Sequence, residues 1–248
     1  MYDYKNKYAI VTGAGKGIGR VIAERFLQEE IEGLAILDYD AELINKAAEE
    51  LKGYGKKILA LCCDVSDEEK VKECFDVIYK EFGRIDILVN NAGITRDVIF
   101  HKMTPAQMHQ VMNVNFFGTY HCLYNAVPIM REQGYGRIVN ISSTSSYGNA
   151  GQANYSSSKA AMEGLTRTLA KELGRKGITI NCVLPGYIDT EMMRAIPEEN
   201  LKRSIAATPM QRLGEPEEVA SLVAFLASDE ASYVSGTCII CSGGSIIH

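Results

Sequence analysis

A glycine-rich loop between a short apolar run and an amphipathic run constrains this chain more than any other stretch. The apolar run Tyr8–Thr12 has the length and composition of a buried strand, and residues 13–19 contain four glycines. The amphipathic run Arg20–Glu29 then predicts a helix. Strand, glycine loop and helix in this order place backbone N–H groups and a helix dipole against a phosphate. The spacing does not fit Gly-x-Gly-x-x-Gly, so a glycine-rich turn without a ligand is the alternative.

The rest of the first half alternates between short apolar runs and amphipathic runs. These predict strands at Leu34–Leu37, Lys57–Cys62 and Ile85–Val89 and helices at Ala41–Lys52 and Asp67–Phe82. Repeated β-α units of this length build a parallel sheet with helices on both faces. No linker, repeat or low-complexity stretch interrupts residues 1–248. We therefore expect one α/β domain, a Rossmann-type doubly wound parallel sheet of about seven strands.

Composition excludes several classes of function. The chain has 248 residues, 46% of them apolar, and a net charge of −5 without a long basic run, so nucleic-acid binding has no electrostatic support. No apolar stretch is long enough to span a membrane, and the first residues lack the apolar segment of a signal peptide. We expect a cytoplasmic protein with neither a membrane nor a nucleic-acid partner.

Cysteines and histidines do not indicate a metal site. The seven cysteines are odd in number, and those inside apolar runs, such as Cys62, Cys63 and Cys182, are expected to be buried, reduced thiols. Cys238 and Cys241 have CxxC spacing, but there is no second pair. The four histidines show no ligand spacing, so no metal is expected.

Charged residues near the glycine loop bear on which cofactor it would hold. Asp38 ends the second predicted strand, where a carboxylate can accept hydrogen bonds from the adenosine ribose and repels a 2′-phosphate. Asp40 adds negative charge nearby. The positive charge of Lys16 in the glycine loop instead favours NADP(H). We therefore expect NAD(H), with NADP(H) still possible. Asp64, just after the third strand, can either reach an adenine or help to begin a helix.

A tyrosine and a lysine four residues apart suggest acid–base chemistry. Tyr155 and Lys159 open an apolar-periodic run that predicts a helix through about Leu173. Positions i and i+4 share a helix face, so the phenol and the ammonium point into the same space. A nearby ammonium and a helix N-terminus both favour phenolate, which would suit the tyrosine to move a proton on an alcohol oxygen. A solvated helix face is the alternative.

In order along the chain, these features resemble the short-chain dehydrogenase/reductase family over essentially the whole length. The motifs that carry the resemblance are Thr12-Gly13-x3-Gly17-x-Gly19, Asp64, Asn90-Asn-Ala-Gly93, Asn115, Ile141-Ser-Ser143, Tyr155-x3-Lys159 and Pro185-Gly186. Within the family the chain is most similar to bacterial 3-oxoacyl-(acyl-carrier-protein) reductases, enzymes of fatty acid metabolism. That similarity rests on Asn-Ala-Gly-Ile-Thr-Arg-Asp97, Gly-Asn-Ala-Gly-Gln-Ala-Asn-Tyr155 and Pro-Met-Gln-Arg-Leu-Gly-Glu-Pro-Glu-Glu-Val219.

The resemblance implies a role for each matching residue. Tyr155 would donate a proton to the carbonyl oxygen as hydride arrives, and Lys159 would lower the tyrosine's pKa and bind the nicotinamide ribose. Ser143 would hold the carbonyl oxygen, and Asn115 would hold a water that connects Lys159 to solvent. The cofactor-binding residues that it implies are Gly13, Gly15, Lys16, Gly17, Ile18, Gly19, Asp38, Asp64, Val65, Asn91, Ala92, Gly93, Tyr155, Lys159, Pro185, Gly186, Ile188 and Thr190.

The chain departs from the family pattern in two places. Ser143 lies twelve residues before Tyr155, whereas the family usually has thirteen, as from Ser142. A deletion of one residue in Thr144–Ala150 explains the spacing most simply, so we assign the serine role to Ser143. Ser242-Gly-Gly replaces the usual Asp-Gly-Gly, which changes a turn more than the chemistry.

The last part of the chain predicts the remaining elements and a cover for the substrate. Strands are expected at Arg137–Ile141, Ile178–Leu184 and Thr237–Cys241, and a helix at Pro216–Leu226. Residues 187–213 contain short helices and are either a mobile lid over the substrate or an ordinary helical excursion.

The resemblance also implies partners. Family members are commonly tetramers packed through the helices around Phe116–Met130 and Tyr155–Leu173, so we expect a homotetramer. Arg131, Arg175 and Lys176 lie where relatives dock an acidic acyl carrier protein. Solvated helix ends are the alternative reading of these three charges.

Three functional hypotheses follow. The leading one is an NAD(H)-dependent oxidoreductase that reduces a 3-oxoacyl thioester to the 3-hydroxyacyl form. The second is the same chemistry on a steroid, a sugar or another secondary alcohol, because carrier-protein reductases usually prefer NADPH and Asp38 does not fit that preference. The third is a protein that binds NAD(H) as a sensor without catalysis.

Overall fold

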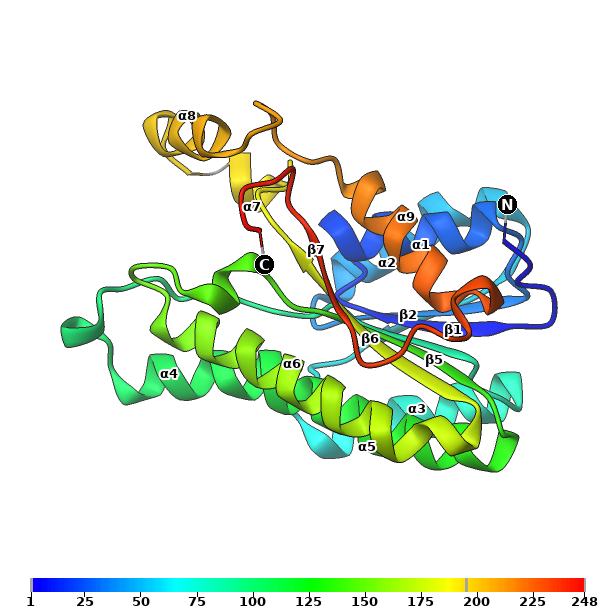
Figure 1. Ribbon diagram of the computed structural model, residues 1–248. Helices are drawn as coiled ribbons and strands as arrows, with labels where there is room; N and C mark the ends of the chain where they lie inside the picture. The colour runs from blue at the N-terminus through cyan, green and yellow to red at the C-terminus, as the bar shows by residue number, and fades with distance from the viewer. Residues whose placement is uncertain (1, 195, 248) are drawn as a thin grey trace.

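A sheet of parallel strands forms the centre of the molecule, in a computed structural model that describes residues 2–194 and 196–247 (Figure 1). The order across the sheet is β3-β2-β1-β4-β5-β6-β7, and every neighbouring pair is parallel. The strands are β1 (Tyr8–Thr12), β2 (Gly33–Asp38), β3 (Lys57–Cys62), β4 (Ile87–Asn90), β5 (Gly136–Ile141), β6 (Ile178–Pro185) and β7 (Cys238–Cys241).

The central strands are nearly continuous apolar runs because both of their faces are covered. Every residue of β2, β4, β5 and β6 is buried, whereas the edge strands β3 and β7 are partly exposed. Successive side chains point to opposite faces, so Val11 joins one core and Ile10 the other.

Helices lie on both faces of the sheet (Figure 1). One face carries α1 (Gly17–Gln28), α2 (Ala41–Leu51) and α9 (Pro216–Ala227), and the other carries α3 (Glu68–Phe82), α5 (Gly118–Gln133) and α6 (Ala153–Leu173). The helix α4 (Pro105–Met112) packs against α6. Two short helices, α7 (Glu191–Arg194) and α8 (Glu198–Ala207), project beyond the carboxyl ends of the strands (Figure 1).

The strand order changes direction between β1 and β4, and this position determines where a ligand can bind. The first three strands run outward from β1, and the chain then crosses back to place β4 on its other side. The loops after β1 and β4 therefore diverge and leave a crevice at their carboxyl ends. The predicted Rossmann-type fold and its single domain are confirmed.

Most predicted elements agree with the structure to within two or three residues, and the differences have local causes. Asp67, which was expected to be the first residue of a helix, accepts a hydrogen bond from the first turn of α3 and so lies just before that helix. A π-helical turn, Asn113–Phe117, joins α4 to α5, and neither it nor α4 was expected. The expectation that Cys62 is buried is wrong, because this residue ends the edge strand β3 and is exposed.

No helix within residues 2–194 and 196–247 has the length and apolar content needed to cross a membrane. In the same part of the chain, no three His, Cys, Asp or Glu side chains come together as metal ligands would.

Candidate active site

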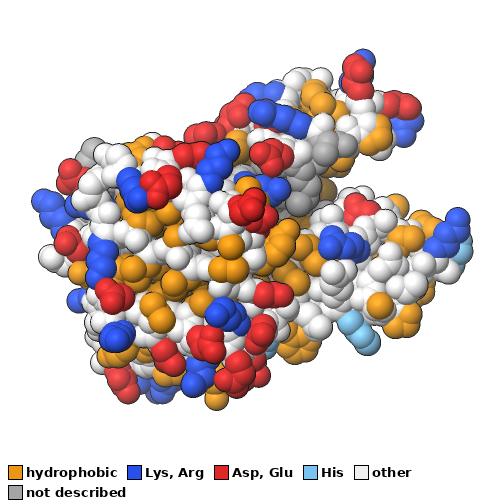
Figure 2. All heavy atoms as spheres, turned by 180° about the vertical axis from the view of Figure 1, so that it is seen from behind, with side chains coloured by type: hydrophobic (Ala, Val, Ile, Leu, Met, Phe, Trp, Pro, Cys, Tyr) orange, Lys and Arg blue, Asp and Glu red, His pale blue; other side chains and the backbone are white. Residues whose placement is uncertain are grey.

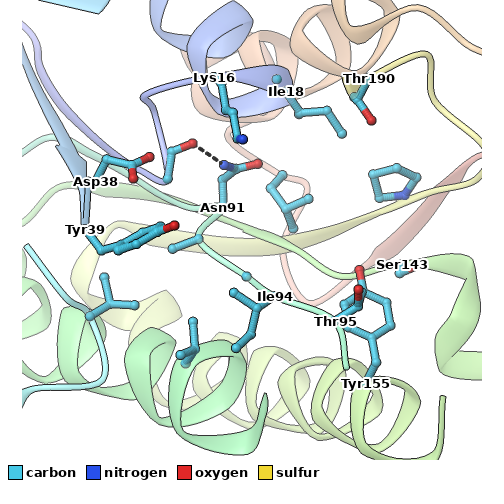
Figure 3. Close-up of a pocket in the computed structure, with 18 of the residues that line it drawn as sticks. Lys16, Ile18, Asp38, Tyr39, Asn91, Ile94, Thr95, Ser143, Tyr155 and Thr190 are labelled. Atoms are coloured by element: carbon cyan, nitrogen blue, oxygen red, sulfur yellow. Dashed lines mark hydrogen bonds between the residues drawn. The ribbon is translucent and has the colours of Figure 1, made fainter. Parts of the chain in front are cut away.

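A cavity of about 460 Å³ opens at the carboxyl ends of the central strands. The loops after β1, β2, β4, β5 and β6 all contribute to its walls, as does the start of α6. Figure 2 shows a hollow between two projections of the surface on this side of the molecule. The close-up in Figure 3 places Asp38 toward one end of the cavity and Ser143 and Tyr155 toward the other.

The glycine loop lies so close to the neighbouring strand end that side chains would not fit. A Cβ on Gly13 would lie 2.8 Å from Cα of Ala92, and a Cβ on Gly19 only 2.2 Å from the carbonyl oxygen of Gly13. Gly13 and Gly17 also have φ of about +60°, which glycine adopts without strain. No side chain caps the N-terminus of α1, so its first N–H groups remain available for an anion. This loop fits the pyrophosphate of a dinucleotide.

Asn91 and Thr12 fix the glycine loop to the end of β4. The side-chain amide of Asn91 donates to the carbonyl oxygens of Thr12 and Gly13, both at 3.0 Å. In return the Thr12 hydroxyl accepts from the backbone N–H groups of Asn91 and Ala92 at 3.0 Å. The first residue of the Asn-Asn-Ala-Gly motif, Asn90, is instead buried and donates to Asn140 of β5.

Asp38 lies at the end of β2 with its carboxylate turned toward the glycine loop. One oxygen accepts from Gly15 N at 2.9 Å and the other from Asp40 N at 3.2 Å. Lys16, the residue that favours NADP(H) in the sequence, forms an ion pair with Glu191 at 3.5 Å. Lys16 is therefore paired with Glu191 and not with the Asp38 carboxylate.

Asp64 and Val65 line the same end of the cavity. The Asp64 carboxylate accepts from the backbone N–H and the hydroxyl of Ser66, at 2.9 and 2.7 Å, so it turns the chain between β3 and α3. The buried Val65 receives a hydrogen bond at its carbonyl oxygen from His121 of α5. Both residues thus have a structural role in addition to their place on the cavity wall.

Tyr155 and Lys159 lie one turn apart at the start of α6 and face the same space, as their spacing predicts. The ammonium of Lys159 is 5.5 Å from the centre of the Tyr155 ring and donates to the carbonyl oxygen of Ile141 at 2.6 Å. The hydroxyls of Ser143 and Tyr155 are hydrogen-bonded. Strand β5 and helix α6 therefore bring the three side chains together.

Burial dominates the acid–base properties of this pair. It raises the pKa of Tyr155, with Asp97 acting in the same direction, and the hydrogen bond from Ser143 opposes it. Burial also lowers the pKa of Lys159 to about 8. Desolvation therefore sets the direction of the Tyr155 shift, and the lowering of this pKa by Lys159 stays a prediction.

The two candidate serines have different partners. The Ser142 hydroxyl is buried and reaches the carboxylate of Glu163 at 3.1 Å and the carbonyl oxygen of Lys159 at 3.2 Å. Ser143 is the serine beside Tyr155, and it also accepts from Ser145 N at 3.1 Å. The segment after it is a short 3₁₀ turn, Thr144–Tyr147.

Asn115 occupies the π-helical turn and is fully buried. Its side-chain carbonyl accepts from Ile94 N at 2.8 Å, and its amide donates to Ile94 O at 3.1 Å and to the Ser158 hydroxyl at 3.0 Å. The segment that follows β4 is therefore fixed to α6 directly below the cavity.

The remaining expected cofactor residues follow β6. Pro185, Gly186, Ile188 and Thr190 all line the cavity. A Cβ on Gly186 would lie 2.8 Å from Cβ of Ser242, so the serine at the family's usual aspartate position packs against this turn. Of the predicted helical stretch beyond Thr190, positions 192 and 195 lie outside the described side chains.

Several residues of the cavity wall were not expected. They come from the loop after β2, from the segment after β4 and from α4 and the π-helical turn: Tyr39, Ile94, Thr95, Arg96, Gln110 and Val114. Of these residues, only Ile94, Thr95 and Arg96 belong to a segment whose sequence resembles the family. The others are brought to the site by packing that no local pattern reports.

Comparison with known proteins identifies the family. A family model described as enoyl-(acyl carrier protein) reductase matches residues 13–245. The chain belongs to the short-chain dehydrogenase/reductase family. As a member it is an oxidoreductase that uses NAD(H) or NADP(H), which agrees with the glycine loop and the strand-end residues described above.

Similar members of the family match nearly the full length of this chain. The 3-oxoacyl-[acyl-carrier-protein] reductase of Thermotoga maritima is 41% identical over 98% of this chain and 99% of its own. The acetoacetyl-CoA reductase of Shinella zoogloeoides is 44% identical over 96% of this chain and 98% of its own. The crystal structure of levodione reductase aligns with a TM-score of 0.92 at 35% identity, over 96% and 97% of the two chains.

Proposed function

We propose that this protein reduces a 3-oxoacyl thioester to the 3-hydroxyacyl thioester with NADH. The observation that carries the proposal is the arrangement of Ser143, Tyr155 and Lys159 at one end of a cavity whose other end holds Asp38. The names of two similar relatives support the substrate class, since one is a 3-oxoacyl-[acyl-carrier-protein] reductase and the other an acetoacetyl-CoA reductase.

The side chains would divide the chemistry between them. The cofactor supplies the hydride when it is bound. The hydroxyls of Ser143 and Tyr155 would donate hydrogen bonds to the substrate's carbonyl oxygen, and Tyr155 would then transfer its proton there. Lys159 would bind the nicotinamide ribose, and its charge would stabilise the phenolate that remains. Asn115 would hold a water behind Lys159 for proton return.

The proposed preference for NADH rests on the charge at Asp38. In Asp38→Asn the side chain can still accept from Gly15 N but no longer repels a 2′-phosphate, so the preference for NADH over NADPH in kcat/KM should fall about tenfold or more. Asp40→Asn is the matched control, because asparagine also caps α2 and the ratio should change less than threefold. An unchanged ratio in Asp38→Asn would remove this carboxylate from cofactor choice.

A steady-state assay tests the proposal as a whole. Acetoacetyl-CoA, a cyclic diketone such as levodione, and a panel of steroids and sugars are offered to the enzyme with NADH and with NADPH. The expected result is fastest turnover of the thioester with NADH. Preference for the diketone would favour the second hypothesis, which the levodione reductase structure supports. Tight NADH binding without turnover of any carbonyl would favour a sensor.

The proposed partners are an acyl carrier protein and further copies of the chain. Arg131, Arg175 and Lys176 are exposed, but they lie just before β5 and β6, at the opposite edge of the sheet from the cavity. A carrier bound there would therefore lie at the opposite ends of the strands from the cavity of the same chain. We also propose that residues 187–213 act as a lid, since Ile188, Thr190 and Glu191 line the cavity and α8, which has no buried residues, projects beyond the carboxyl ends of the strands.

A further inference from the structure

Arg96 places a positive charge on the wall of the substrate half of the cavity. It follows Thr95, which Figure 3 shows at the end that holds Ser143 and Tyr155. Its carbonyl oxygen accepts from the buried amide of Asn154, the residue before Tyr155, at 3.0 Å. The backbone of Arg96 is therefore fixed to the start of the helix that carries the proposed proton donor.

The guanidinium is oriented by neutral acceptors. Its Nε donates to Oε1 of Gln110 in α4 at 3.1 Å, and one Nη donates to the carbonyl oxygen of Thr95 at 2.7 Å. A guanidinium has five N–H donors in one plane, so three remain, and two of them belong to the second Nη. Such donors suit the oxygens of a carboxylate or a phosphate.

No carboxylate neutralises this charge among residues 2–194 and 196–247, where none of the ion pairs includes Arg96. The neighbouring Asp97 accepts instead from the Gln152 amide at 2.9 Å, and Gln152 is itself held by Asn149. The other two cations on the cavity wall are already engaged: Lys16 pairs with Glu191, and Lys159 is buried against Ile141 O.

We propose that Arg96 binds an anionic group of the thioester substrate, either a carboxylate at the far end of the acyl chain or a phosphate of the pantetheine-bearing arm. The inference rests on the proposed function, because it assumes a thioester in this half of the cavity. Both groups present paired oxygens to a planar guanidinium, and a charge-assisted pair of this kind is stronger than a neutral hydrogen bond. Arg96 thereby extends substrate recognition beyond the reacting carbonyl.

Three 3-oxoacyl thioesters separate the two sources. Acetoacetyl-N-acetylcysteamine has neither anion, acetoacetyl-CoA has phosphates, and 3-oxoadipyl-N-acetylcysteamine has a terminal carboxylate. Dissociation constants are measured by calorimetry with NAD⁺ bound, which allows binding without turnover, for wild type, Arg96→Gln and Arg96→Lys. Lys72→Gln on the exposed face of α3 is the matched control for loss of one positive charge.

The expected result is that Arg96→Gln raises the dissociation constant of one anionic thioester about tenfold or more and changes that of the neutral thioester less than twofold. Arg96→Lys should raise the same dissociation constant by less than Arg96→Gln does. Lys72→Gln should leave the dissociation constants of all three thioesters unchanged. Selective loss with acetoacetyl-CoA identifies the phosphate, and selective loss with 3-oxoadipyl identifies the acyl carboxylate. Equal effects on all three, or none, would overturn the inference. Failure of the wild type to bind any thioester would instead overturn the proposed function.

Discussion

Tyr155 lies in the first turn of α6 with its hydroxyl bonded to Ser143 and its ring 5.5 Å from the ammonium of Lys159. Because burial raises the pKa of the phenol, the hydroxyl holds its proton across the neutral range. It is therefore able to donate a hydrogen bond to a carbonyl oxygen before it donates the proton itself.

Removal of that hydroxyl should affect the chemical step. In Tyr155→Phe the ring remains but the proton donor is lost, so kcat should fall at least about a hundredfold, while the dissociation constant for NADH changes less than threefold. Single-turnover kinetics and cofactor fluorescence measure the two quantities. Near-full activity of the variant would contradict the assignment of Tyr155 as the general acid.

At pH values below its folded-state pKa, Lys159 should lower the free energy of unfolding. Burial lowers this pKa to about 8 from the ordinary 10.5, so the unfolded chain binds the proton more tightly than the native protein does. Lys159→Met should therefore raise the free energy of unfolding by about 1–3 kcal/mol at pH 7, after the lost bond to Ile141 O is taken into account.

The advantage of Lys159→Met should shrink as pH rises from about 8 toward 10.5, because the wild-type lysine is then neutral in both states. Urea unfolding of both proteins at pH 7 and pH 10 measures the difference. The same difference at the two pH values would mean that the ammonium is not desolvated in the folded protein.

Sequence patterns predicted which residues meet at the site better than they predicted the pKa shifts and hydrogen bonds of those residues. The i, i+4 spacing places Tyr155 and Lys159 on one face of a helix whatever that helix packs against. The direction of the pKa shift depends on burial beneath β5 and β6, which no local pattern reports. In the same way, the spacing predicted a carboxylate near the ribose site, but the bond between Asp38 and Gly15 N depends on how β2 and the glycine loop approach each other.

At the scale of elements, the glycine loop and α1 depend on close contact between backbones. A Cβ on Gly19 would lie 2.2 Å from Gly13 O, a distance that real contacts never show, so Gly19→Ala must displace either the loop or the start of α1. We expect it to lower the free energy of unfolding by at least about 2 kcal/mol and to weaken NADH binding about tenfold or more.

Gly53→Ala is the matched control, because a Cβ there meets nothing within 4 Å, and stability should change by less than about 1 kcal/mol. Chemical denaturation and calorimetric titration with NADH follow both variants. If Gly19→Ala bound NADH as tightly as the wild type does, the loop would tolerate the displacement, and close backbone contact would not be needed for cofactor binding.

The strands were predictable because a parallel sheet covered on both faces requires continuous apolar runs. The turn Asn113–Phe117 was not predictable, because a π-helical turn differs from an α-helix by the register of its hydrogen bonds and not by its composition. Its presence nevertheless matters to the site, since it carries Asn115 to Ile94 and Ser158.

At the scale of the whole molecule, α5 presents an unusual number of aromatic side chains to its surface. Phe117, at its N-terminal boundary, and Tyr120 and Tyr124 within it are each exposed by 44% or more, and their helix is one of the two expected to form the tetramer. A charge placed there should be costly to bury between subunits.

Tyr124→Arg should therefore break the assembly. Light scattering during gel filtration should give about four times the chain mass of 27.3 kDa for the wild type and a smaller multiple for the variant. Tyr79→Arg, an equally drastic change on the exposed face of α3, should leave the mass unchanged. A wild-type protein that elutes as a single chain would contradict the expected tetramer.

The strand order also has a consequence for synthesis of the chain. During synthesis β1 and β2 are made before β4, so the edge of β1 that pairs with β4 cannot be paired until Ile87–Asn90 is made. During that interval the nascent chain exposes an apolar strand edge of the kind that promotes aggregation. A fragment that ends before β4 should therefore be insoluble, and circular permutants that begin at β4 should depend more on chaperones than the natural order does.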